Sequence, residues 1–158
     1  MLSGFALLLV SASFAEPSAK APAAASTPQK TLYARLGGAY AIATVVDDFI
    51  EALLVDEVLN ANPAIKEART RVPKAGLKFH VTTLMCQVTG GPQKYTGRGM
   101  KESHSHLKIT ETEWDAMAKD FVTVLDKYKV PKPEQQELLQ IVVKTKGDIV
   151  LADAKALK

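Results

Sequence analysis

The histidines are the residues of this chain whose type and spacing could support chemistry. The chain contains three of them, His80, His104 and His106. At about 100° per residue on a helix, His104 shares a face with Met100 and Leu107, whereas His106 lies about 200° away. We therefore expect His104 to face the interior and His106 to face outward.

His80 lies on a second apolar helical stripe, between Leu77 and Leu84, and is also expected to point inward. A single inward histidine can be a core residue bonded to a backbone carbonyl. Two inward histidines on different helices favour a cofactor or metal site, because neutral imidazole is a common iron ligand and haem occupies an apolar cavity. Zinc held by His80, His104 and Cys86 is an alternative, but these spacings are not those of zinc sites.

Composition limits the other classes of function. The chain has 158 residues, 47% of them hydrophobic, enough for one domain with a core. Its net charge of +3 comes from interleaved lysines and carboxylates, so no nucleic-acid partner is expected. The single cysteine, Cys86, excludes an intramolecular disulfide and a zinc ribbon. The chain has no Cys-x-x-Cys-His motif, so any haem would be held without the usual thioether bonds.

The N-terminal composition predicts export. An apolar run, Leu2–Val10, precedes small residues at Ser13 and Ala15, as in a signal peptide, and is too short to span a bilayer. We expect an exported protein, periplasmic or secreted, with no membrane span in the mature chain. The predicted segments are a signal peptide at 1–15, an Ala/Pro-rich linker at 16–30, a folded domain at 31–152 and a tail at 153–158.

The folded part has helical periodicity throughout, and no alternation is long enough for a sheet. Four substantial and two short helices are predicted, so the fold class is all-α. The expected helices cover residues 32–36, 42–54, 73–89, 100–107, 111–128 and 134–149, with an irregular, weakly helical stretch at 60–71. Thr110 and Glu113 form a predicted capping box, and Trp114 and Tyr128 are expected to share a buried stripe.

Two blocks of sequence resemble group I truncated haemoglobins. One is Leu32-Tyr33-x-x-Leu36-Gly37-Gly38 with the helix of Phe49 behind it. The other is Gly90-Gly91-Pro92-x-Lys94-Tyr95-x-Gly97-Arg98-x-Met100-x-x-x-His104. The resemblance extends from about Leu32 to about Val143. It implies a truncated globin-like, two-over-two helical sandwich around haem.

The resemblance also implies roles for individual residues. His104 would be the fifth ligand of the iron, and its other ring nitrogen would donate to a backbone carbonyl near Met100. Arg98 and Lys94 would pair with the haem propionates. The cofactor expected is haem b, bound non-covalently, and the residues expected to bind it are Phe49, Ile50, Leu77, His80, Val81, Leu84, Lys94, Tyr95, Arg98, Met100, His104 and Leu107.

The chain departs from the family pattern on the distal side. Ile50 stands where the family usually has tyrosine, and Leu77 and Val81 stand where it often has glutamine. An apolar distal side is expected, with His80 as its one polar candidate. His80 could bind the iron as a sixth ligand, which we favour because an unpaired buried imidazole is costly. It could instead donate a hydrogen bond to a bound ligand.

Three functions follow from these alternatives. The leading one is binding of a diatomic ligand, O2, NO or CO. The second is a six-coordinate bis-histidyl haem protein for electron transfer or redox or gas sensing, with an electron-donor protein as partner. The third is a haem-free helical module for another apolar ligand. NO dioxygenation or peroxidase activity is compatible with any open haem, but no motif indicates a dedicated substrate site.

Overall fold

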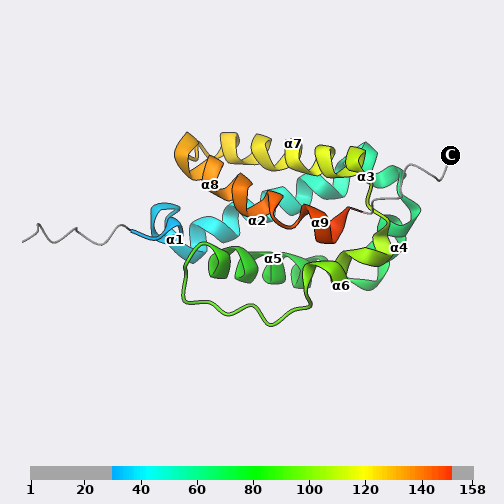
Figure 1. Cartoon of the computed structure of the whole chain (residues 1–158), viewed down its shortest axis with the longest axis horizontal. Coiled ribbons are helices and arrows are strands. Elements are labelled where there is room, and N and C mark those ends of the chain that lie inside the picture. Colours follow the sequence, from blue (N-terminus) through cyan, green and yellow to red (C-terminus); the bar gives the residue numbers. More distant parts are fainter. Residues whose placement is uncertain (1–29, 151–158) are drawn as a thin grey trace, which may run out of the picture.

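A computed structural model describes residues 30–150 of the chain (Figure 1). The predicted signal peptide, the linker up to residue 29 and the C-terminal tail lie outside the described residues. Within them the helices are α1 (Leu32–Arg35), α2 (Gly38–Val55), α3 (Glu57–Ala61), α4 (Pro63–Arg71), α5 (Lys74–Val88), α6 (Met100–His104), the 3-10 turn η1 (Ser105–Leu107), α7 (Glu111–Lys127), α8 (Lys132–Val143) and α9 (Lys146–Ile149). The one strand-like pairing in residues 30–150 is a parallel bridge between Ile109 and Val150.

The helices form two layers. In Figure 1, α7 and α8 lie along the top, α5 and α6 along the bottom, and α2 runs between them. Helix α2 packs against both α5 and α7, and α6 packs against α9. The predicted all-α, two-over-two arrangement is therefore confirmed.

The two double-glycine motifs meet around Tyr33. Its hydroxyl accepts hydrogen bonds from the Ala39 N–H at 3.1 Å and from Gln93 Nε2 at 3.3 Å. A Cβ on Gly91 would lie 2.5 Å from Tyr33 Cδ2, and Gly90 has a positive φ of 88°. Glycine therefore lets the chain leaving α5 turn sharply and pass against α1.

The core consists of two buried clusters joined by Phe49. One cluster contains Phe121 and Leu125 of α7, and the other contains Ile50 and the fully buried Cys86. Phe49 packs against both clusters, and its ring lies 5.0 Å from that of Phe121. The α2 stripe predicted from the sequence thus connects the layers.

The predicted number of helices is wrong, because the stretch at 60–71 is ordered as helix. Asp56 Oδ1 accepts the Leu59 N–H at 2.8 Å and so caps α3. Asn62 Oδ1 accepts the Ala64 N–H at 2.9 Å and caps α4, with a proline in its first turn. The predicted last helix also breaks after Val143, which leaves α9 as a separate turn.

Helix α7 begins as predicted and ends differently. The Thr110–Glu113 capping box is present. Trp114 is buried, but Tyr128 is exposed and donates a hydrogen bond to Asp48 Oδ2 at 2.7 Å. The prediction that Tyr128 is a core residue is wrong: its N–H still bonds to the Val124 carbonyl at 3.1 Å, so it keeps the helical register of α7, but it lies at the exposed end of the helix beside Asp48.

Within residues 30–150, no helix combines the length and the hydropathy needed to cross a membrane.

Candidate functional site

A cavity of about 1250 Å³ opens between the two layers, with walls from α2, α5, α6, α7 and α8. Small-molecule pockets typically measure roughly 300–1,000 Å³, so this cavity suits a larger cofactor. Every residue expected to bind haem lines it except Lys94, which is exposed on the α5–α6 loop.

His104 lies at the C-terminal end of α6 on the cavity wall. Its Nδ1 lies 2.8 Å from the carbonyl oxygen of Met100. Because a carbonyl can only accept, Nδ1 carries the proton and Nε2 keeps the lone pair that a metal requires. The predicted hydrogen bond that fixes the tautomer is therefore present.

Burial keeps His104 in this neutral form. Desolvation lowers the pKa of His104, the Met100 hydrogen bond partly opposes this, and nearby His106 lowers the pKa further. His106 is exposed, as predicted, yet it also lies at the cavity wall, in the 3-10 turn η1 that follows α6. Asn62 ties this segment to α4 by donating to the Leu107 carbonyl at 2.9 Å.

The wall opposite, made by α2 and α5, is apolar. All residues that α2 contributes to it are apolar, and among them Ile50 is only 2% exposed. Helix α5 contributes two polar side chains, Lys74 and His80. Lys74 is in an ion pair with Glu51 at 2.9 Å, so His80 is the polar group available to a ligand on this wall.

His80 lines the cavity as predicted, but it lies at the edge and is exposed rather than buried in the interior. Its ring meets those of Phe79 and Tyr95 edge to face, at centroid distances of 5.6 and 6.0 Å. Its ring nitrogens make no hydrogen bond with the described residues. The sequence pattern identified the face of α5 but could not show how close the α5–α6 loop comes to it.

The α5–α6 loop carries the basic residues assigned to the propionates. Arg98 lines the cavity and Lys94 does not. Tyr95 also lines it and donates from its hydroxyl to the Arg98 carbonyl at 2.8 Å. The structure therefore separates two residues that the sequence motif groups together.

Arg69 is a cavity residue that the sequence analysis missed. It donates to the carbonyls of Leu53 at 2.6 Å and Leu54 at 3.4 Å, and to Asn60 Oδ1. Burial lowers the pKa of Arg69. Arg69 thus places a positive charge in the cavity wall and donates hydrogen bonds to the last carbonyls of α2. Its signal in the sequence, the Asn62–Pro63 helix start, shows that the stretch is helical but not which way Arg69 points.

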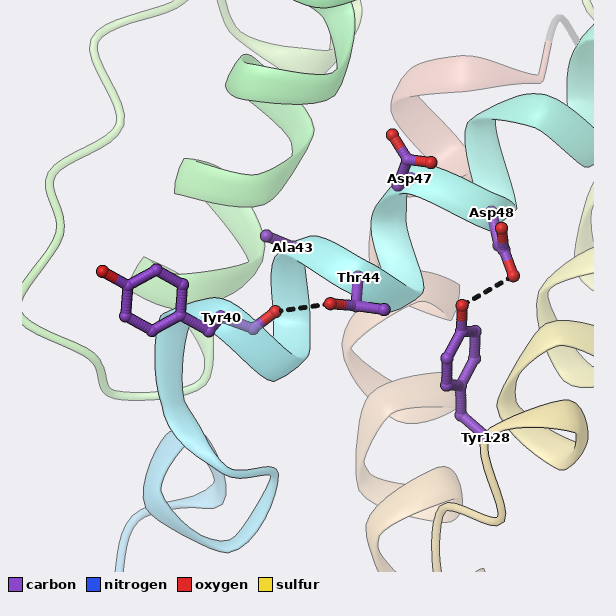
Figure 2. Close-up of a pocket in the computed structure, with 6 residues that line it drawn as sticks. All are labelled: Tyr40, Ala43, Thr44, Asp47, Asp48 and Tyr128. Carbon is purple, nitrogen blue, oxygen red and sulfur yellow. Dashed lines mark hydrogen bonds between the residues drawn. The ribbon is translucent and has the colours of Figure 1, made fainter.

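A second, shallower hollow lies where α2 passes the end of α7 (Figure 2). Its two carboxylates already have partners. Asp48 accepts from Lys127 and Tyr128, and Asp47 pairs with Lys78 at 2.6 Å. This hollow therefore offers no obvious chemistry.

The zinc alternative is not supported by the structure. Nowhere in the described part of the chain do three histidine, cysteine or acidic side chains come together as a group able to hold a metal ion. Cys86 is fully buried in the core and does not line the cavity that holds His80 and His104.

Comparison with known proteins identifies the family. A sequence model described as "Bacterial-like globin" matches residues 31–150. The chain belongs to the bacterial-like globin family. Similar curated proteins include the group 1 truncated hemoglobin GlbN of Synechocystis sp., 33% identical over 106 residues that cover 65% of this chain and 81% of that protein. The GlbN of Nostoc commune is 30% identical over 120 residues, which cover 76% and 97%.

Solved structures agree with this assignment to the truncated globins of group 1. The 2/2 hemoglobin from Synechococcus sp. PCC 7002, in the cyanomet state and with covalently attached heme, superposes with a TM-score of 0.68. That protein is 28% identical, and the match covers 77% of this chain and 98% of that one. Truncated hemoglobin from Tetrahymena pyriformis shares the fold, with a TM-score of 0.67 at 23% identity over 77% of this chain and 98% of that one.

Membership of the globin family implies haem binding, and the residues of this truncated globin fit that cofactor. The cavity is large and mostly apolar, and one neutral imidazole with an available Nε2 lies on its wall.

Proposed function

We propose that this truncated globin binds haem between its two layers and takes up a diatomic gas, O2, NO or CO, on the side facing α2 and α5. Bound haem would supply an iron that His104 would hold and to which a small ligand could bind. The observation that carries the proposal is the His104 Nδ1–Met100 hydrogen bond, which leaves Nε2 for the metal.

The chain's own residues define the environment of that ligand. Ile50, Leu77 and Val81 exclude water from the α2–α5 wall, because none of them offers a polar group. In such a dry site a single hydrogen-bond donor strongly stabilises a polar bound ligand. From the cavity edge, His80 would either donate a hydrogen bond to the bound ligand or hold the iron as a further ligand.

Non-covalent haem b is the form we propose. The chain's only cysteine is buried in the core, outside the cavity wall, so it offers no thioether bond to the cofactor. Arg98, whose side chain is exposed at the cavity, is the candidate partner of a propionate. Lys94 is the weaker candidate because it does not line the cavity.

A second candidate function is electron transfer or sensing by a bis-histidyl haem, with an electron-donor protein as partner. The observation that favours it is the position of His80, at the cavity edge with no hydrogen bond from its ring to a described residue. A ring nitrogen with no hydrogen-bond partner among residues 30–150 keeps a lone pair that a metal can accept.

Absorption spectroscopy of the haem-loaded protein tests the proposal. We expect His104→Ala to remove or strongly shift the Soret and visible bands, because the fifth ligand is lost. His80→Ala should remove split visible bands from the ferrous spectrum if His80 binds iron, and should leave a five-coordinate spectrum that takes up CO at once.

His106→Ala is the matched control, since it removes the remaining histidine near the cavity and should leave the spectra unchanged. A protein that shows no Soret band with haem, or one whose band survives His104→Ala, would contradict the proposed function.

A further inference from the structure

His80 meets two aromatic rings, those of its neighbour Phe79 and of Tyr95, and of these only Tyr95 lines the cavity. The rings of His80 and Tyr95 are 6.0 Å apart between centroids with an interplanar angle of 84°, an edge-to-face arrangement. Both residues line the cavity, and they come from different segments, α5 and the loop that follows it. The loop therefore holds an aromatic ring against the one polar side chain on the α2–α5 wall that has no polar partner.

The position of Tyr95 is itself defined by several contacts. Its N–H donates to Gln87 Oε1 at 2.7 Å, which attaches the loop to α5. Its hydroxyl donates to the Arg98 carbonyl at 2.8 Å. Its ring covers Gly97, where an added Cβ would lie 2.5 Å from Tyr95 Cζ. The ring is thus held in place from both ends.

We propose that Tyr95 is a positioning residue that holds His80 at the mouth of the cavity and so competes with haem iron for that imidazole. The inference rests on the proposed function, since it concerns His80 as a ligand of bound haem. Tyr95 sets the balance between a His80-bound state and a state open to gas.

The physical basis is a small difference in free energy between two positions of the His80 side chain. In one it packs against Tyr95 at the mouth of the cavity, and in the other it would bind the haem iron. Edge-to-face pairs contribute a modest stabilisation beyond their buried area. His80 has no hydrogen bond to a described residue that would fix it in either place. The contact with the Tyr95 ring is therefore enough to change the ratio of His80-bound to open protein by about two- to tenfold.

Three substitutions in the haem-loaded full chain test this. Tyr95→Leu removes the ring and should raise the ratio of six- to five-coordinate ferrous protein by about two- to tenfold, with a matching slowing of CO binding. Tyr95→Phe keeps the ring and its attachment to Gln87 and loses only the hydroxyl bond to Arg98, so its ratio should stay much closer to the parental value than that of Tyr95→Leu. Tyr40→Leu is the matched control, because Tyr40 is 92% exposed and lies at the other hollow (Figure 2).

Nuclear magnetic resonance of the diamagnetic carbonyl form provides a readout independent of ligand binding rates. The ring protons of His80, assigned by their loss in His80→Ala, should carry a ring-current contribution from Tyr95, beside that of Phe79, that is lost in Tyr95→Leu and survives in Tyr95→Phe. Gly97→Ala displaces the ring without removing it and should act in the same direction as Tyr95→Leu, which guards against a folding defect in one variant.

An unchanged or lower six-coordinate ratio in Tyr95→Leu overturns the inference, as does a Tyr95→Phe protein that behaves like Tyr95→Leu. If haem spectra depend on His104 while Tyr95→Leu changes nothing, the inference alone fails. If no variant binds haem, the proposed function fails and the inference fails with it.

Discussion

The two histidines of the cavity differ in what determines their position. His104 is oriented by a carbonyl four residues earlier in the same helix, a contact that the local sequence already contains. His80 packs against a ring from a loop that begins after its helix ends. The histidine expected to bind the iron is therefore set locally, whereas the distal one depends on the loop conformation.

Asp120 is a residue whose ionisation should cost stability. Its Oδ2 is buried without a hydrogen-bond partner among the described residues. Burial raises the pKa of Asp120, nearby Asp56 raises it further, and Lys119 partly offsets both. The folded state therefore favours the protonated carboxyl, a contribution that is fully present below the ordinary pKa of 3.8 and is lost as pH rises.

We expect Asp120→Asn to raise the melting temperature at pH 7, with the gain shrinking toward zero as pH falls below about 4. Thermal unfolding followed by circular dichroism across this pH range measures it. Asp126→Asn is the matched control, because Lys132 and Gln135 lower the pKa of Asp126. That substitution should lower the melting temperature at pH 7 and have less effect in acid. Equal effects of the two variants would contradict this account.

At the scale of elements, the ends of α5 determine how the site is assembled. Pro73 precedes its first turn, and the double glycine after Thr89 directs the chain into the loop that carries Tyr95 and Arg98. The Tyr33 N–H donates to the Thr89 carbonyl at 2.8 Å, so α1 is attached at the same point. One end of α5 thus joins the N-terminal helix to the cavity loop.

Gly91→Ala should destabilise the protein by about 1–3 kcal/mol, because the new methyl group would overlap the Tyr33 ring and lie 2.7 Å from the Cys86 carbonyl. Chemical denaturation measures the free energy of unfolding. Gly76→Ala, on α5 itself, meets no atom within 4 Å and should instead stabilise by up to about 1 kcal/mol. A neutral Gly91→Ala would show that this junction tolerates a side chain.

At the scale of the whole molecule, the cavity exists because two layers are held apart and joined at their margins. Phe49 links the two buried clusters. Arg35 of α1 donates to Glu134 at 2.8 Å and to Glu137 at 2.6 Å, which fastens α1 to α8. The layers therefore meet at one end of the fold and leave room for a cofactor between them.

The segment before the folded domain carries the predicted export signal. We propose that the chain is exported and cleaved near Ala15, on the evidence of the apolar run Leu2–Val10 and the small residues that follow it. Expression of the full chain, followed by fractionation and N-terminal sequencing, should give a mature protein that begins close to Glu16. An uncleaved N-terminus in the cytoplasmic fraction would contradict export.

The sequence by itself determined the features that depend on neighbours a few residues away. These include the helical stripes, the Thr110–Glu113 capping box and the His104 hydrogen bond to Met100. Helices α3 and α4 belong to this group as well. Their caps, Asp56 and Asn62, are local signals that the sequence analysis did not use.

Tertiary structure alone decided which side chains reach the cavity and what they meet there. It brought Arg69 into the wall, left Lys94 outside it and set Tyr95 against His80. It also exposed Tyr128 beside Asp48. The physical reason is that helical periodicity defines which face of one helix is apolar, whereas the contacts of a side chain depend on how separate helices and loops pack together.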